Sequence, residues 1–340
     1  MMPFHLILVP AAILVGTALL SAALIVGLKP LLVRYALARP NARSSHRIPT
    51  PQGGGIAVVG ACLVVAGVIL WRTELPLDRL LIVAGACVAL AVVGAVDDIR
   101  PLPAGPRLLL QVAAVAAVVV ASQVRVLPEA VPLVLEQALL ILGGVWFVNL
   151  VNFMDGLDWI TVAEMVPITA FVAVFGMLPP DPGPAPLVAL TLCGALLGFA
   201  PFNKPVAKLF LGDVGSLPIG LLVGWMLLEL AGTGALAAAL LLPLYHLMDA
   251  TITLLRRLAR GEKVWEAHRS HFYQQATNNG FTPLSVSLHV FGLNLVLAGL
   301  AGVTLLWPSW PVQIACLAAG VVLVGLLLSH FARPRLKSPA

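Results

Sequence analysis

Long runs of apolar residues follow one another along the chain, and short groups of proline, glycine and charged residues separate them. A run of about 20 mostly apolar residues is long enough to cross a bilayer as a helix. The runs are continuous rather than alternating, which excludes the pattern of a transmembrane β-barrel. The sequence therefore predicts an all-α, polytopic integral membrane protein with about 11 transmembrane helices. The predicted spans are residues 4–28, 54–71, 80–96, 108–122, 137–153, 160–178, 186–201, 217–231, 235–255, 284–306 and 311–331.

The composition agrees with this architecture and excludes a water-soluble domain. Hydrophobic residues make up 60% of the 340 residues and charged residues only 10%, whereas a soluble domain carries about 25% charged residues. The first run is longer than the core of a signal peptide and has no basic start, so we expect it to be retained as a span. The four cysteines stand singly, with no spacing typical of a metal or disulfide site. We expect residues 1–340 to form a single transmembrane domain.

The distribution of lysine and arginine predicts the orientation. If the N-terminus lies outside, 17 of the 20 basic residues fall in inside segments, and only Arg72, Arg79 and Arg125 lie outside. By the positive-inside rule, the N-terminus is outside and the C-terminus is cytoplasmic. The inside loops also carry most of the unusual polar groups, so we expect the chemistry on the cytoplasmic face.

Two carboxylate motifs stand at predicted helix ends. Asp97 and Asp98 close the span 80–96, and adjacent carboxylates can bind a hard cation or divide the roles of anion and base. The alternative is a solvated helix end. Asp213 lies between glycines at the start of the span 217–231, where a metal would bridge a carboxylate and a phosphate. The alternative there is helix capping by Asp213 or Ser216.

A third motif combines amides and carboxylates. Asn149, Asn152 and Asp155 are three residues apart and share one helical face, and Gly156 then lets the chain turn toward Asp158. Such groups can bind a base edge, ribose hydroxyls or a metal. The alternative is that the asparagines join neighbouring helices. The spacing of the whole set favours binding.

The first inside loop contains Arg43, His46, Arg47 and the glycines Gly53–Gly55. Glycine N–H groups at a helix start can receive phosphate oxygens. The alternative, which is favoured for this loop alone, is that the basic residues hold the loop inside and the glycines pack against a helix.

Histidines and buried ionisable residues form the remaining candidates. His268 and His271 flank Arg269 in the largest inside loop, which suits phosphate better than zinc because the other zinc ligands are missing. His246 and Asp249 share a helical face within a span and predict a polar contact there. Glu164, which we expect to face inward, has no assigned role.

Together these groups suit transfer of a phosphoryl group between a soluble nucleotide donor and a membrane-held acceptor. In order along nearly the whole chain, the motifs resemble those of the polyprenyl-phosphate N-acetylhexosamine-1-phosphate transferases (glycosyltransferase family 4). The matching motifs are Pro49–Gly55, Asp97-Asp98, Asn149–Asp158, Phe210–Ser216 and His268–His271. The segments Pro40–His46 and Ala267–Tyr273 look most like the WbpL-like branch that starts O-antigen and related surface glycans.

The resemblance implies a reaction and its partners. UDP-N-acetylhexosamine and undecaprenyl phosphate would give undecaprenyl-diphosphate-N-acetylhexosamine and UMP, with Mg²⁺ or Mn²⁺ as cofactor. The enzyme would be a multi-pass protein of the bacterial cytoplasmic (inner) membrane, with an active site built from cytoplasmic loops. The lipid bilayer is a partner, nucleic acid is not, and a homodimer is left open.

The resemblance also implies residue roles. Asp213 would hold the metal on the donor diphosphate, and Asp97 and Asp98 would deprotonate or orient the lipid phosphate. The expected catalytic residues are Asp97, Asp98 and Asp213. The expected metal ligands are Asp98, Asp155 and Asp213. The expected substrate-binding residues are Thr50, Gly54, Asn149, Asn152, Asp155, Asp158, Asn203, His268, Arg269 and His271. Asp249 also matches a family position.

One position departs from the family pattern. The family usually has a second small residue after Asp158, where this chain has Trp159. A bulky indole there could reshape the nucleotide side or stack on a ring. Two other classes of function are also considered. A secondary transporter would place its ionisable groups near the midplane, and an inactive scaffold would need none of the carboxylates.

Overall fold

A computed structural model describes residues 5–38, 49–72, 78–178, 183–263 and 268–334. Arg43, His46 and Arg47, the candidates for phosphate binding in the first inside loop, lie outside the described residues, as does the whole segment Pro40–His46. All other predicted site residues are described.

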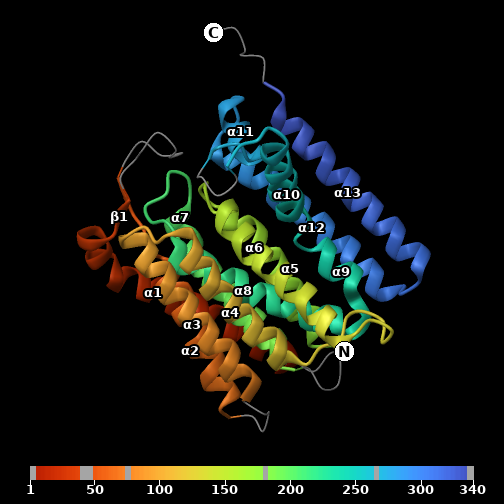
Figure 1. The fold of residues 1–340 in the computed structure, drawn as a ribbon. Coiled ribbons are helices and arrows are strands. Elements are labelled where there is room, and N and C mark those ends of the chain that lie inside the picture. Colours follow the sequence, from red (N-terminus) through yellow and green to blue (C-terminus); the bar gives the residue numbers. More distant parts are fainter. Residues whose placement is uncertain (1–4, 39–48, 73–77, 179–182, 264–267, 335–340) are drawn as a thin grey trace.

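The described chain is a bundle of helices, as predicted (Figure 1). Eight of its helical stretches are long and apolar enough to cross a membrane. They are α1 (His5–Tyr35), α3 (Asp78–Ile99), α4 (Ala104–Ser122), α5 (Leu133–Met154), α7 (Ala185–Asn203), the stretch that begins with α8 (Asp213–Leu230), α12 (Pro283–Leu306) and α13 (Trp310–Ala332). Two shorter apolar helices, α2 (Gly55–Leu70) and α6 (Ile160–Gly176), complete the predicted pattern up to residue 231. The chain is therefore a multi-pass membrane protein, while the total of 11 spans stays a prediction.

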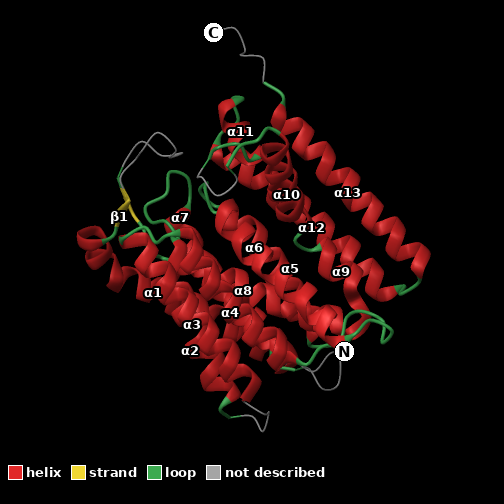
Figure 2. Ribbon diagram, in the orientation of Figure 1, coloured by secondary structure: helices red, strands yellow, loops and turns green. Residues whose placement is uncertain are grey.

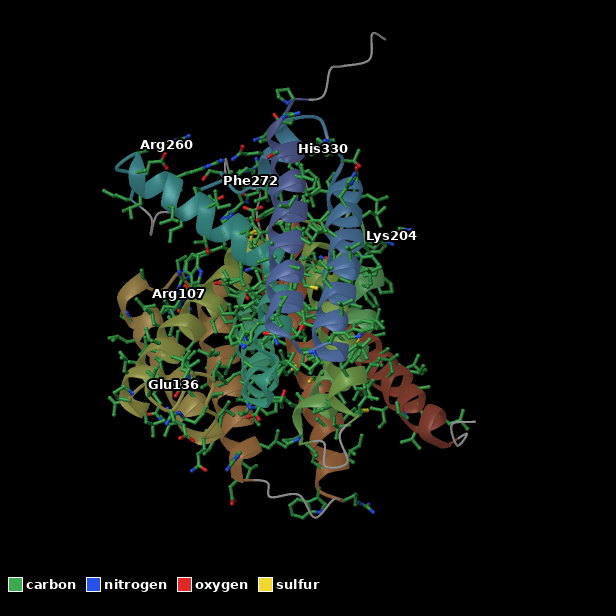
Figure 3. All side chains as sticks on the ribbon, turned by 90° about the vertical axis from the view of Figure 1, so that its right-hand side faces the viewer. Arg107, Glu136, Lys204, Arg260, Phe272 and His330 are labelled. Atoms are coloured by element: carbon green, nitrogen blue, oxygen red, sulfur yellow. The ribbon has the colours of Figure 1, made fainter. Side chains whose placement is uncertain are left out.

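The predicted span 235–255 is not one continuous helix. After α8 the chain passes through the π-helical turn η1 (Ala231–Ala235), where Gly234 has a φ of +88°, into α9 (Leu236–Leu241). Pro243 then interrupts the helix because it lacks an N–H and clashes with the preceding turn. The next helix, α10 (Leu244–Ala259), buries one face and exposes Leu255 and Leu258 on the other. In Figure 3, α10 leans away from the other helices toward Arg260.

Two contacts show how the ends of the chain are arranged. A Cβ on Gly194 of α7 would meet Leu14 of α1, and a Cβ on Gly198 would meet Ala18. The residue numbers rise together, so α1 and α7 run parallel and both end on the same face of the bundle. α13 also ends on this face, where Asn279 donates to the carbonyl of Phe331. The start of α1 and the end of α13 thus lie on opposite faces, which suits an odd number of crossings. Which face is cytoplasmic stays a prediction.

Glycines let three helices meet closely at the start of α8. A Cβ on Gly55 of α2 would lie 2.1 Å from the Cα of Gly215 in α8. A Cβ on Gly94 of α3 would lie 2.2 Å from the carbonyl oxygen of Asp213. Side chains larger than hydrogen would push these helices apart, so the glycines set the position of Asp213.

Gly54 and Gly55 pack against α8 and its preceding loop, and the N–H groups of both are already hydrogen-bonded. The N–H of Gly54 donates to the carbonyl of Phe210 and that of Gly55 to the carbonyl of Leu211, both at 2.9 Å. These contacts favour the packing alternative for the glycines, and substrate binding by Gly54 stays a prediction. Just before these glycines, β2 (Thr50–Pro51) pairs antiparallel with β1 (Leu37–Ala38) in a short ribbon, drawn in yellow in Figure 2. Thr50 is buried in this ribbon.

Candidate active site

Asp98, at the end of α3, caps the N-terminus of α8. Its Oδ1 accepts the N–H of Asp213 at 3.0 Å and its Oδ2 accepts the N–H of Val214 at 3.1 Å. The first N–H groups of a helix have no intrahelical partner and favour negative charge. Gly212 makes this contact possible, because it has a φ of +78° and a Cβ there would lie 2.6 Å from Asp98 Oδ2. The predicted alternative, capping by Asp213 or Ser216, does not occur, and the carboxylate of Asp213 faces its neighbours from other helices.

Asn152 of α5 confirms the predicted proximity of the amide motif to Asp213. Its Nδ2 donates to Asp213 Oδ1 at 2.8 Å and to the Oγ of Ser216 at 2.9 Å. The amide thus fixes one oxygen of Asp213, and the other oxygen lies 3.8 Å from Arg107.

Arg107 is a site residue that the sequence argument missed. This arginine in the first turn of α4 donates to Asp97 Oδ2 at 2.5 Å, and Asp97 Oδ1 accepts the N–H of Leu102 at 2.5 Å. The arginine therefore joins the carboxylates of Asp97 and Asp213. Figure 3 labels it on the same side of the bundle as α10. Its signal in the sequence is a single basic residue just before the predicted span 108–122.

Asp155 follows α5 directly and lies within electrostatic reach of the other carboxylates. Burial, with the charges of Asp213, Asp98 and Asp158, raises the pKa of Asp155 to about 8, although a hydrogen bond from the hydroxyl of Thr161 lowers it. Like charges held close together in a half-buried place favour protonation or a bound cation. The carboxylates predicted to converge from distant parts of the chain do converge.

The residues present fit a divalent cation that a substrate helps to hold. Within the described residues, no group of three or more metal-ligating side chains stands ready as a complete cage. However, Mg²⁺ is usually held by one or two carboxylates together with substrate phosphates and waters. The cluster holds four carboxylates and the arginine that contacts Asp97 and Asp213, so the charge balance favours a cation. Asp98, Asp155 and Asp213 remain the candidate ligands.

Two residues predicted to bind substrate have hydrogen bonds to other parts of the protein. Asn149 donates to Gln111 Oε1 of α4 at 2.7 Å, so it joins α4 to α5 as the alternative reading held. Asp158 is 2% exposed, and its Oδ2 accepts the N–H of Ala207 at 2.9 Å. Substrate binding by Asn149 and Asp158 stays a prediction.

Asn203 and Trp159 form a second structural pair. The buried Asn203 accepts the N–H of Trp159 at 2.8 Å and donates to the carbonyl of Leu209 at 3.0 Å, and its predicted substrate contact stays a prediction. Trp159 has a φ of +64°, a conformation that favours glycine, which explains why a small residue suits this position. Its indole N–H donates to the carbonyl of Ala200 at 2.6 Å, so the indole is fixed against α7.

The histidine loop lies over α10 and is partly buried. His271 is 3% exposed, and its Nδ1 lies 3.2 Å from Asp249 Oδ1. Asp249 also accepts the N–H groups of Phe272 and Tyr273, at 3.0 and 3.1 Å, and so caps α11 (Phe272–Asn278). His271 is therefore a buried partner of Asp249, so the predicted polar contact of Asp249 is with this loop, and phosphate binding by His271 stays a prediction.

The ring of His268 stacks on that of His271 at a centroid distance of 4.8 Å. Burial, with the nearby His271 and Arg257, lowers the pKa of His268 to about 4, so this ring is neutral at pH 7. His268 and Arg269 are half-buried, as is Ser270. A role in substrate contact stays a prediction for both.

Helix α11 connects the histidine loop to the carboxylates. The hydroxyl of Tyr273 donates to the carbonyl of Phe153 at 3.1 Å, two residues before Asp155. A Cβ on Gly156 would lie 2.2 Å from the same hydroxyl oxygen. The helix that follows the loop is thus packed directly against the turn that carries Asp155.

Fold and site together define a multi-pass helical membrane protein with a cluster of carboxylates, an amide and an arginine at one end of its bundle. The family model for glycosyl transferase family 4 matches residues 80–231, which include Asp97, Asp98, Asp155 and Asp213. The chain belongs to this family, the polyprenyl-phosphate hexosamine-1-phosphate transferases that its motifs resemble.

Individual relatives agree with this assignment. The chain is 30% identical to the decaprenyl-phosphate N-acetylglucosaminephosphotransferase of Mycobacterium tuberculosis (strain H37Rv), over 75% of this chain and 72% of the relative. It is 27% identical to the probable undecaprenyl-phosphate N-acetylglucosaminyl 1-phosphate transferase of Bacillus subtilis (strain 168), over 71% and 69%. It is also 30% identical to the phospho-N-acetylmuramoyl-pentapeptide-transferase of Synechococcus sp. (strain JA-3-3Ab), over 87% and 89%.

Proposed function

We propose that this protein transfers N-acetylhexosamine-1-phosphate from a UDP-sugar to undecaprenyl phosphate, releasing UMP. The observation that carries the proposal is the meeting of Asp97, Asp98, Asp155 and Asp213 around Arg107 and Asn152 at one end of the bundle. Three relatives from different bacteria, all named as phosphosugar transferases, support the same chemistry. The product would be undecaprenyl-diphosphate-N-acetylhexosamine.

The reaction requires one oxygen of the lipid phosphate to attack the phosphorus that carries the sugar. The bond from that phosphorus to the oxygen bridging it to the uridine-linked phosphate then breaks, and UMP leaves with the bridging oxygen. All participating groups are anionic, so the protein must position them and offset their charge. Mg²⁺ or Mn²⁺, when bound, would supply charge neutralisation, with Asp213 as its main ligand and Asp98 and Asp155 beside it.

Different residues of the chain would position the acceptor, the donor and the site itself. Arg107, held by Asp97, would orient the incoming lipid phosphate, because an arginine offers several donors in a fixed geometry. Asp98 would keep the start of α8 in place, and Asn152 would fix the rotamer of Asp213. His268 and Arg269, on the loop beside Asp155, would contact the donor.

An apolar cavity supports a lipid acceptor. A cavity of about 290 Å³ lies between α4, α5, α8 and α9, with Val115, Phe147 and Leu240 among its lining residues. The helices α5 and α8 carry Asn152 and Asp213 at the end where the carboxylates meet. A prenyl chain beside these helices would bring its phosphate toward the site.

The location and pathway complete the proposal. We place the protein in the bacterial cytoplasmic membrane, with the site on the cytoplasmic face, as the distribution of basic residues predicts. The match of Ala267–Tyr273 to the WbpL-like branch supports a role in starting O-antigen or a related surface polysaccharide. The donor sugar would be an N-acetylhexosamine.

The test is release of UMP by purified protein in nanodiscs. A panel containing UDP-GlcNAc, UDP-GalNAc and their 6-deoxy relatives is supplied with undecaprenyl phosphate and Mg²⁺. We expect UMP from at least one donor, and none when the lipid phosphate or the metal is omitted. If no donor yields UMP, the proposal fails. Uptake of a solute by proteoliposomes would then favour a transporter, and unchanged glycan output in cells carrying Asp213→Ala would favour a scaffold.

A further inference from the structure

Glu164 is a buried carboxylate that the proposed chemistry does not use. It lies in the second turn of α6 and is fully buried, as are His246 of α10 and Asn294 of α12. Its Oε2 lies 3.1 Å from His246 Nδ1 and accepts a hydrogen bond from the side-chain amide of Asn294. Its Oε1 accepts the backbone N–H of His246 at 3.4 Å. One side chain therefore joins α6, α10 and α12.

The contact falls where α10 begins. His246 belongs to the first turn of α10, directly after the interruption at Pro243, and the first N–H groups of a helix have no partner within it. A buried N–H without an acceptor costs roughly 1–3 kcal/mol. Glu164 supplies that acceptor from another helix, as Asp98 does for α8 and Asp249 for α11. Because Pro243 interrupts the helix, this contact helps to set the direction in which α10 continues.

Helix α10 links the Glu164 contact to the histidine loop. Asp249, three residues after His246, is the buried carboxylate that caps α11 and contacts His271. A shift of the first turn of α10 would move Asp249 and with it the N-terminus of α11.

From α11 the contacts reach the carboxylate site. Tyr273 donates to the carbonyl of Phe153 and packs on Gly156, on either side of Asp155. A continuous series of contacts thus runs from Glu164 through α10 and α11 to the turn that carries Asp155.

We propose that Glu164 is a positioning residue that fixes the start of α10 and thereby holds the His268–His271 loop in place beside Asp155. This proposal rests on the proposed function, because the loop is assigned to the donor sugar nucleotide. Loss of the carboxylate would loosen the loop and weaken donor binding, while the lipid phosphate, assigned to Arg107, would bind as before.

Kinetics of UMP release test the proposal with three variants. Glu164→Leu removes both acceptors, whereas Glu164→Gln keeps one oxygen for the His246 N–H. The new amide of the glutamine can donate to Asn294 Oδ1, which has no hydrogen-bond partner among the described residues. Thr169→Val is the matched control, because Thr169 is buried in the same helix and its hydroxyl donates to carbonyls of its own turn.

We expect Glu164→Leu to raise KM for the UDP-sugar about tenfold, the equivalent of one hydrogen bond to a charged group. KM for undecaprenyl phosphate should stay unchanged, and Glu164→Gln and Thr169→Val should both resemble wild type. An unchanged donor KM in Glu164→Leu would overturn the proposal. Equal changes in both KM values, or the same donor effect in Thr169→Val, would also overturn it.

Hydrogen exchange supplies a readout that needs no activity. The amides of residues 268–278 should exchange faster in Glu164→Leu than in wild type, Glu164→Gln or Thr169→Val, while those of α4 stay unchanged. Exchange that is identical in all four proteins, or faster throughout the molecule, would refute the positioning role. If wild-type protein releases no UMP, the proposed function fails and the exchange experiment still decides the role of Glu164.

Discussion

The close approach of α3 and α8 gives the sharpest mutational test of how Asp213 is positioned. Replacing Gly94 with alanine would place a methyl carbon 2.2 Å from the carbonyl oxygen of Asp213 and 2.3 Å from its carbonyl carbon. Both obstacles are backbone atoms, so no side-chain rotation can relieve the contact. An ordinary contact begins at about 3.4 Å, and the start of α8 must therefore move by about 1 Å.

The expected effect follows from this displacement. Overpacking of this kind costs about 1–3 kcal/mol of stability. A misplacement of about 1 Å in a catalytic group can lower the rate by about 10²-fold. Gly94→Ala should therefore lower kcat for UMP release by about two orders of magnitude and reduce the unfolding temperature in detergent.

Gly85→Ala is the control in the same helix. A Cβ on Gly85 meets no atom of the described residues within 4 Å. Alanine is also a better helix former than glycine by up to about 1 kcal/mol. Gly85→Ala should keep wild-type activity and equal or higher stability. If Gly94→Ala and Gly85→Ala behave alike in both assays, the close approach does not position Asp213 and the reasoning is refuted.

Three further predictions follow from the same site. Asn152→Leu should lower UMP release by about 10²-fold, because Asp213 loses its donor, whereas Asn149→Leu should keep activity and lose only about 1 kcal/mol of stability; equal losses of activity would contradict the separation of their roles. Burial and like charges raise the pKa of Asp155 from 3.8 to about 8, so wild type without metal should lose stability as the pH rises between these values. The unfolding temperature of Asp155→Asn should therefore exceed that of wild type by more at pH 9 than at pH 6, and a constant difference would contradict the burial of this charge. Asp97→Asn, Asp98→Asn and Asp213→Asn should each lower kcat/KM by about 10²-fold or more. Near-wild-type activity in all three variants would refute the proposed active site.

The sequence predicted the membrane helices well because a continuous apolar run has one main structural meaning. It predicted a continuous helix over 235–255 wrongly, because Pro243 and the polar face of α10 interrupt a run that is apolar on average. Hydrophobicity alone does not show where a helix changes direction.

Polar residues inside spans were harder to interpret, because each needs a partner but the sequence does not show which kind. Asn152 and Asn149 stand three residues apart on one helix, yet the first contacts Asp213 and the second contacts Gln111 of a neighbouring helix. Asp158 hydrogen-bonds to the backbone of a loop. Only the packing of other helices separates these cases.

The roles of glycines and the identity of helix-capping residues were also ambiguous in the sequence. A glycine at a helix start can expose its N–H or allow close packing, and at Gly54 the packing partner is a loop more than 150 residues away in sequence. Capping of α8 by Asp98 was unpredictable for the same reason, since the cap comes from another helix. Arg107 is a site residue because α3 and α4 pack together, and the sequence alone does not show that packing.

Binding of Mn²⁺ tests the central claim most directly, because the account holds that converging carboxylates grip a cation against a diphosphate. Electron paramagnetic resonance of Mn²⁺ with the protein in nanodiscs should show a bound signal that strengthens when the reactive UDP-sugar is added. This signal should be lost in Asp213→Asn and kept in Asn149→Leu. A bound signal that is the same in wild type and Asp213→Asn would contradict the account. A signal that does not change when the UDP-sugar is added would also contradict it.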